Sequence, residues 1–128
     1  MGSQEDTEMN KRQTGGLYEA KAAAWLEEQG LVIVARNFRC RFGEIDLIAR
    51  HQDYLVFVEV KYRKSAAAGH PAEAVTFAKQ KTICKVAEYY CMMHDVEADQ
   101  AVRYDVVGIC GVDIDWYPNA FDHIRHGL

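Results

Sequence analysis

The segment GEIDLIARHQDYLVFVEVK (43–61) contains two strand-like runs separated by a polar turn. β-Branched and aliphatic residues dominate both runs, which predicts an antiparallel hairpin. Each run also carries an acid: Asp46 lies in EIDLIA, and Glu59 lies two residues before Lys61 in VFVEVK. Two carboxylates and an ammonium therefore occupy a part of the sequence in which a core strand should be hydrophobic.

The second run separates into two faces, because successive side chains of a strand point to opposite sides. Three valines share one face, which we expect to be core. The other face holds Leu55, Phe57, Glu59 and Lys61, so it is apolar at its start and charged at its end. This pattern is typical of a site at the carboxyl end of a strand.

The relation of Asp46 to Glu59 depends on the hairpin register. If the turn uses the four residues 50–53, Asp46 faces Phe57 and Glu59 is its diagonal neighbour on the same face, about 7–8 Å away. A shift of one residue would place the two acids on opposite faces. The functional prediction therefore depends on this register.

A third acid lies in the first predicted helix. Residues 17–29 are strong helix formers and end at Gly30, a natural helix stop. At 100° per residue, Glu19 lies on the same stripe as Ala22, Ala23 and Leu26. A carboxylate on such a stripe is either a satisfied, partly buried acid or a site residue.

Three acids that converge beside a core raise one another's pKa unless a cation compensates them. A divalent ion with oxygen ligands, Mg²⁺ or Mn²⁺, fits Asp46 and Glu59 and leaves positions for water and phosphate. Lys61 would then support developing charge or position the attacking water. The structural alternative is a Glu59–Lys61 ion pair that closes the strand, worth about 0–1 kcal/mol if exposed.

The remaining elements complete an α/β domain. We expect strands over 31–41, 44–50, 54–62, 102–110 and 112–117, a loop over 63–71 and a long helix over 72–94. The last two strands would form a hairpin across Gly111. The order α-β-β-β-α-β-β predicts a central mixed sheet flanked by helices, with an antiparallel meander followed by a helical crossover.

Length and composition favour one cytoplasmic domain. The chain has 128 residues with 49% hydrophobic content, enough for one core. We expect residues 17–128 to form it and 1–16 to be a disordered leader, wholly native or partly added by cloning, with Met9 as a candidate natural start. No apolar run reaches membrane-span length. The four cysteines form no CxxC pair and read as small hydrophobic residues in a reducing compartment.

The net charge of −4 hides a basic middle section. Between residues 36 and 85 ten cations stand against five acids, a local net charge of +5. A phosphate-binding face needs local rather than global positive charge, although a solvated surface explains the excess equally well.

The motifs resemble the restriction-endonuclease-like superfamily, whose loose signature is an acid followed by (D/E)xK. The resemblance is closest to the small YraN-like family and, through it, to archaeal Holliday-junction resolvases. Its motifs run from about Gly16 to Trp116: E-x-x-A-A at 19–23, Asn37, GEIDLIA at 43–49, FVEVK-x-R at 57–63, Gly69, Lys79-Gln80 and R-x-D-V-V at 103–107.

The resemblance implies a restriction-endonuclease-like fold with its site on the second and third strands. It also implies roles: Asp46 and Glu59 as metal ligands, Lys61 as the catalytic lysine and Glu19 as the helix-borne acid. Two positions depart from the pattern. Ile45 replaces the proline common before the first acid, and Tyr18 replaces a favoured glycine, which would crowd the first helical turn.

We therefore expect a Mg²⁺- or Mn²⁺-dependent phosphodiesterase that acts on DNA, including branched DNA. The alternatives are a non-catalytic nucleic-acid scaffold and a protein-interaction module that uses exposed aromatics at Trp116, Tyr117 and Phe121. A homodimer fits a branched substrate. We expect Arg103 and Asp105 to pair at the sheet edge. Candidate nucleic-acid contacts are Arg39, Arg41, Arg63, Lys64, Lys79, Gln80 and Lys81.

Overall fold

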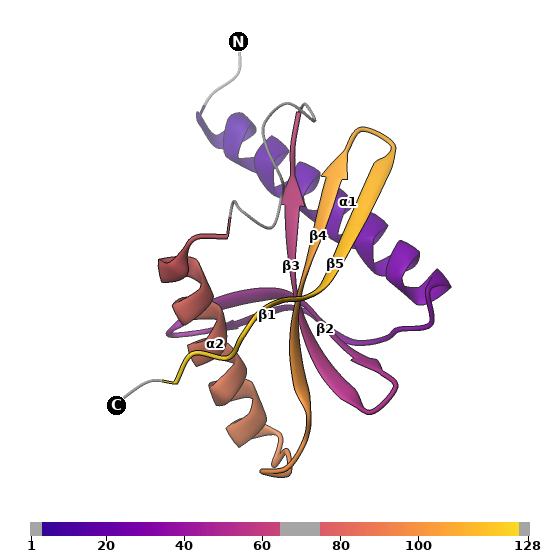
Figure 1. The fold of residues 1–128 in the computed structure, drawn as a ribbon. Coiled ribbons are helices and arrows are strands. Elements are labelled where there is room, and N and C mark those ends of the chain that lie inside the picture. The colour runs from indigo at the N-terminus through magenta and orange to yellow at the C-terminus, as the bar shows by residue number, and fades with distance from the viewer. Residues whose placement is uncertain (1–3, 65–74, 126–128) are drawn as a thin grey trace.

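A computed structural model describes residues 4–64 and 75–125, with side chains from residue 16 onward. It contains two helices and a five-stranded sheet (Figure 1), with the elements α1 (Gln4–Glu28), β1 (Val32–Cys40), β2 (Gly43–His51), β3 (Tyr54–Tyr62), α2 (Phe77–Met93), β4 (Val102–Cys110) and β5 (Asp113–Phe121). This confirms the predicted element order and the α/β class. The greater part of the predicted 63–71 loop, and residues 72–74, lie outside the described residues, and the leader over 1–16 stays a prediction.

The sheet is mixed, as predicted. Its spatial order is β1-β2-β3-β4-β5, with β3 and β4 parallel and the other neighbours antiparallel. The parallel pair requires a crossover, which contains α2. β5 continues beyond the predicted end at Tyr117 and includes Pro118. An edge strand tolerates a proline because one side of its backbone needs no ladder partner.

Each helix covers one face of the sheet (Figure 1). On the α1 side, Ala22, Ala23 and Leu26 have no exposed surface and pack on Val56 and Val58. On the other side, residues of α2 pack on a second cluster. Both faces of β3 are thus core, which explains its almost continuous apolar run.

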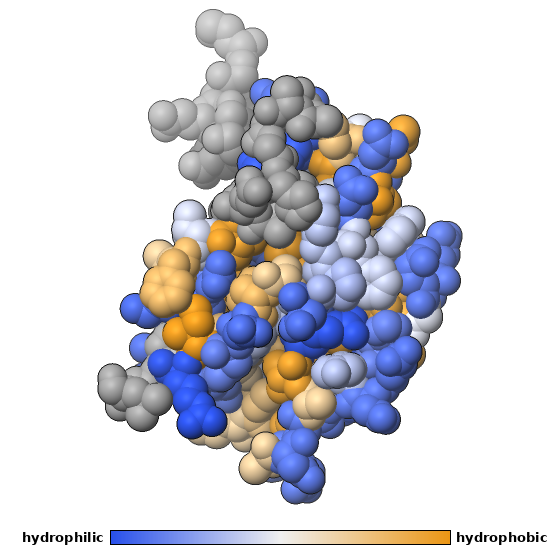
Figure 2. Space-filling view, viewed as in Figure 1, coloured by the Kyte–Doolittle hydropathy of each residue, from blue (hydrophilic) through white to orange (hydrophobic). Residues whose placement is uncertain are grey.

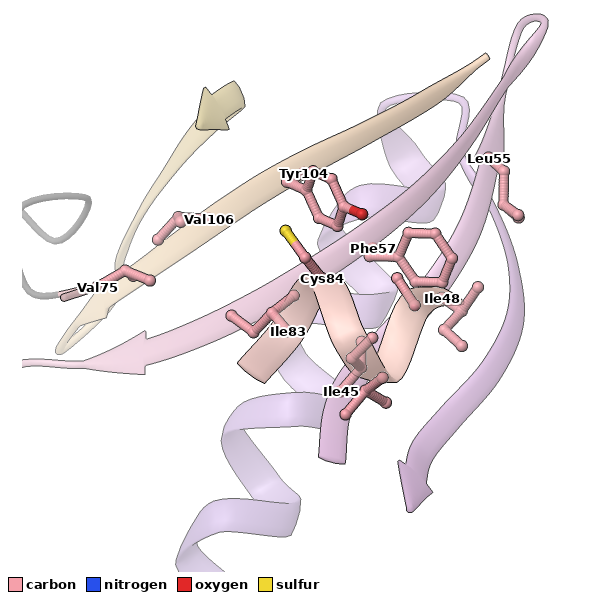
Figure 3. Packing of buried hydrophobic residues seen from close by; sticks show 11 residues of the cluster. Ile45, Ile48, Leu55, Phe57, Val75, Ile83, Cys84, Tyr104 and Val106 are labelled. Atoms are coloured by element: carbon pink, nitrogen blue, oxygen red, sulfur yellow. The ribbon is translucent and has the colours of Figure 1, made fainter. Parts of the chain in front are cut away.

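The α2 side of the core is built around aromatic rings. Phe57 and Tyr104 point from neighbouring strands toward α2, where Ile83 and Cys84 meet them (Figure 3). The two rings stack with centroids 5.8 Å apart. On the outside, hydrophilic and hydrophobic residues alternate over the face seen in Figure 2. Neither helix, over the residues described, has the length and apolarity to cross a bilayer.

The register of the β2–β3 hairpin differs from the prediction by two residues. The ladder runs from Leu47↔Val58 to His51↔Tyr54, so the turn is only Gln52-Asp53 and not the four residues 50–53. Gln52 takes a positive φ of 56° to close it. A two-residue shift keeps every side chain on its expected face, because the period of a strand is two.

Two further expectations are corrected. The Arg103–Asp105 pair exists, with Nε–Oδ1 at 2.9 Å, but it lies buried on β4, which has a neighbour on each side, and not at the sheet edge. The C-terminal aromatics are half-buried and not exposed: Trp116 contacts Trp25 edge-on and Phe121 stacks on Tyr104.

Candidate active site

The site lies where β2 and β3 stop pairing. Continued by one step, the observed register would set Asp46 opposite Glu59, closer than the predicted diagonal arrangement. Asp46 instead turns its carboxylate to the neighbouring strand, where Oδ2 accepts a 2.7 Å hydrogen bond from the backbone N–H of Val60. The side chain thus occupies the position in which a ladder carbonyl would otherwise bind.

Glu59 is buried, with 7% of its surface exposed. Its pKa is raised to about 7, first by burial and then by the negative charge of Asp46, while Lys79 and Lys61 oppose the rise. Lys61 shares its face of β3, and Lys61 Nζ lies 3.5 Å from Glu59 Oε1. This pair is not an exposed surface bridge, so the small value of such bridges does not apply to it.

Glu19 approaches from α1, one turn before the fully buried Ala22 and Ala23. Its pKa is raised to about 7 by burial and by the charge of Asp46, against a hydrogen bond from Asn37 that lowers it. The pKa of Asp46 is also raised by burial, although the Val60 N–H and a hydrogen bond with Glu19 favour its ionised form. The stripe predicted from helical periodicity therefore carries this carboxyl to the other two.

Lys79 completes the cluster from α2. Its positive charge favours the ionised forms of both Asp46 and Glu59. Three acids and two lysines are thus gathered from α1, β2, β3 and α2 at one end of the sheet. The structure brings together the four residues Glu19, Asp46, Glu59 and Lys61, and their catalytic assignment stays a prediction.

Tyr18, at the position where a glycine was expected, does not crowd the first helical turn. Helix α1 begins at Gln4, so Tyr18 lies in its interior. Its ring stacks on Tyr62 with centroids 4.2 Å apart and 16° between planes. The hydrogen bond between the two hydroxyls raises the pKa of Tyr18. This contact joins the residue before Glu19 to the residue after Lys61.

The donor set suits a hard divalent cation only in part. Among the described residues no group of three or more His, Cys, Asp and Glu side chains is placed to hold a metal ion. Asp46 and Glu59 alone would supply two carboxylates, with water or substrate oxygen in the other positions. That is the usual way in which proteins bind Mg²⁺, so the residues present fit this ion without a dedicated cage.

The candidate nucleic-acid contacts divide among different places. Arg39 pairs with Glu44, Nε–Oε2 2.6 Å, on the exposed part of β1. Gln80 binds the carbonyl of Val75 at 3.0 Å, so it anchors the start of α2. Arg63 is half-buried and Lys64 exposed at the end of β3. Arg41 and Lys81 line a groove beside α2.

Two contributors to the site were absent from the predicted residue set. Asn37 takes a positive φ of 52° on β1 and hydrogen-bonds Glu19. An asparagine inside a β-branched run was a usable signal, since asparagine tolerates this conformation. The Val60 N–H is a main-chain group, and no residue type could have announced it.

Comparison with known sequences identifies the family. Residues 18–109 match the Uncharacterised protein family UPF0102. Three proteins named as UPF0102 proteins are similar over most of both chains. The one from Lachnoclostridium phytofermentans is 47% identical over 89% of this chain and 97% of its own. That from Aeromonas hydrophila is 47% identical over 84% and 83%, and that from an Enterobacter species 40% identical over 94% and 92%. These matches bear out the YraN-like resemblance, and the chain belongs to the uncharacterised protein family UPF0102.

Proposed function

We propose that this protein is a Mg²⁺- or Mn²⁺-dependent phosphodiesterase of the restriction-endonuclease-like type that cuts nucleic acid, with DNA as the expected substrate. The observation that carries the proposal is the buried pair of acids at the point where β2 and β3 separate. Asp46 is anchored there by Val60 N–H at 2.7 Å, and Glu59 lies 3.5 Å from Lys61. An ordinary structural ion pair would not gather a second and a third carboxyl in a half-buried place.

The electrostatics support a cation-binding role. Glu19 and Glu59 each have a pKa raised to about 7 by burial and by the charge of Asp46. Such a cluster is poorly compensated at neutral pH, and groups with strongly shifted pKa values gather at functional sites. When bound, the divalent ion would activate water and stabilise charge on the phosphate.

The chain's own residues then have distinct tasks. Asp46 and Glu59 would hold the ion, and the Val60 N–H would keep the Asp46 carboxylate in one orientation. Lys61, on the same face as Glu59, would place its ammonium beside the reacting phosphate or the attacking water. Glu19 would accept or hold a proton at the opposite side of Asp46, from α1.

The experiment compares Asp46→Asn and Lys61→Ala with Asp53→Asn, an exposed turn residue of the same hairpin. Each purified variant is incubated with duplex, single-stranded and four-way-junction DNA in Mg²⁺, Mn²⁺ and EDTA. We expect the first two variants to lose cleavage by about 100-fold or more and the control to keep it. Cleavage at the rate of the unmodified protein by both site variants would refute the proposal.

A non-catalytic nucleic-acid scaffold is the second candidate, favoured by the basic groove described below. It predicts retention of DNA by gel shift without product in either metal. A homodimer, suited to a branched substrate with two-fold symmetry, also stays a proposal, which light scattering on the purified chain would test.

A further inference from the structure

A groove of about 550 Å³ opens beside α2, away from the acid cluster. The turn between β1 and β2 forms one wall and the outer side of α2 forms the other. The described lining residues include three cations and no acid: Arg41, Phe42, Ala78, Lys81, Thr82 and Lys85. Over α2 the surface in Figure 2 accordingly mixes hydrophilic and hydrophobic residues.

The cations of the groove are held by aromatic rings. The guanidinium carbon of Arg41 lies 4.8 Å from the centroid of Phe42, and the ammonium of Lys85 lies 4.5 Å from it. Lys81 likewise lies 5.7 Å from the ring of Phe77. A ring face attracts a cation but takes up none of its N–H donors as a strong hydrogen bond. An incoming anion can therefore use the donors of Arg41 and Lys85.

Close packing fixes the shape of this groove. Gly43, directly after Phe42, has a φ of +146°, and a Cβ built there would lie 2.9 Å from Cγ2 of Thr82. The turn therefore rests directly on α2 and leaves no room for a side chain. Phe42 also contacts Tyr89 edge-on with centroids 5.9 Å apart. The ring that holds Arg41 and Lys85 is thus itself held in place.

The groove lies at a defined spacing from the acid cluster. Phe42 precedes Asp46 by four residues of extended chain, about 13 Å at roughly 3.3 Å per residue. A nucleic-acid strand advances about 3.4 Å per nucleotide. A strand with one phosphate at Asp46 would therefore bring another to the groove about four nucleotides away.

We propose that this groove binds the phosphodiester backbone of a nucleic acid about four nucleotides from the phosphate held at the acid cluster. The placement relative to the cut rests on the proposed function, whereas the binding itself does not. The groove makes the protein require substrate on that side of the cut. It contributes affinity without sequence preference, since its donors meet phosphate and not base edges.

The test uses the double variant Arg41→Ala/Lys85→Ala and, as a control with the same change in charge, Lys21→Ala/Arg125→Ala. Binding of a fluorescent 30-nucleotide DNA is measured by anisotropy in EDTA between 50 and 200 mM salt. We expect the groove variant to bind about 10-fold more weakly and the slope of log Kd against log salt to fall by about 1.5–2, as for two lost phosphate contacts. The control should keep most of the affinity, and equal urea midpoints would show that both variants are folded.

Other outcomes separate the groove from the proposed function. Affinity and salt slope equal to those of the unmodified protein would overturn the groove. Competition by inorganic phosphate as effective as that by the oligonucleotide, per phosphate, would make it a small-anion site and also overturn it. If Asp46→Asn cuts normally but the groove variant still binds weakly, the nuclease proposal fails and the binding groove stands. If cleavage depends on Asp46, DNA truncated to two nucleotides on the groove side should be cut about 10-fold more slowly, and the groove variant should lose this length dependence.

Discussion

The Oδ2 atom of Asp46 accepts a 2.7 Å hydrogen bond from the backbone N–H of Val60, the residue between Glu59 and Lys61. The strands stop pairing at Leu47↔Val58, so this carboxylate, and not a backbone carbonyl, joins β2 to β3 at their end. One contact thereby satisfies a backbone donor and orients an acid beside a second acid. The predictions below begin from this arrangement.

The bond from Val60 has a value that two variants can isolate. Asp46→Asn and Asp46→Ala both remove the charge, but only asparagine keeps a carbonyl acceptor for the N–H. We expect Asp46→Ala to be less stable than Asp46→Asn by about 1–3 kcal/mol, the cost of an unsatisfied buried donor. Urea unfolding at pH 8 measures this difference. Equal midpoints would mean that water replaces the carboxylate at no cost.

Glu59 should make stability depend on pH. Burial and the charge of Asp46 raise its pKa from the ordinary 4.5 to about 7 in the folded state. Between these values the folded protein binds more protons than the unfolded chain, so stability falls as pH rises from about 4.5 to 7 and the loss is complete above 7. Glu59→Gln should therefore be more stable than the unmodified protein at pH 8 and no more stable at pH 4.5. The exposed Glu28→Gln serves as the control and should follow the unmodified curve in metal-free urea titrations at both pH values.

A divalent cation should reverse this destabilisation. Mg²⁺ binds the ionised carboxylates, so 10 mM Mg²⁺ should raise Tm by several degrees at pH 8 if Kd is about 1 mM or lower. The rise should be smaller at pH 5.5, where protons compete for Glu19 and Glu59. Asp46→Asn/Glu59→Gln should abolish it. Scanning calorimetry with Mg²⁺ against EDTA measures the effect, and an equal rise in the double variant would contradict a site at these acids.

Asp105 should be a stability residue and not a catalytic one. It accepts two bonds from Arg103 at 2.9 Å and one each from Trp116 Nε1 and the Asn119 N–H at 2.9 Å. Asp105→Ala would leave a buried guanidinium without its partner, at a cost of about 3–5 kcal/mol. Replacing both members, as Arg103→Met/Asp105→Leu, should recover part of the loss. Urea unfolding followed by tryptophan fluorescence would show it, and a cost below about 1 kcal/mol for Asp105→Ala would contradict the role.

Gly43 tests the packing of the groove. A Cβ there would meet Thr82 Cγ2 at 2.9 Å, and its φ of +146° favours glycine. We expect Gly43→Ala to cost roughly 1–3 kcal/mol and to weaken DNA binding. Thr82→Ser removes Cγ2, so the Gly43→Ala/Thr82→Ser double variant should recover part of the stability. Strictly additive losses in this cycle would show that the two positions are not in contact.

The elements of the fold were readable in the sequence because each rests on local patterns. Alternation in 54–62 predicted the two faces of β3, and helical spacing predicted that Glu19 would share a stripe with Ala22 and Ala23. Both are found in the structure. The same patterns supplied the motif that led to the family. These signals depend only on residues a few positions apart.

The sequence by itself determined which acids share a face of the sheet; the tertiary structure decided how close they come and what surrounds them. Gln52-Asp53 carries no glycine turn signal, so the two-residue turn, and with it the register that sets Asp46 toward Glu59, was not readable. Lys79 reaches the acids, and Arg41 meets Lys85 across Phe42, only because α2 packs against the sheet. Charge and packing act through space between segments distant in the chain, whereas a sequence pattern records only neighbours along it.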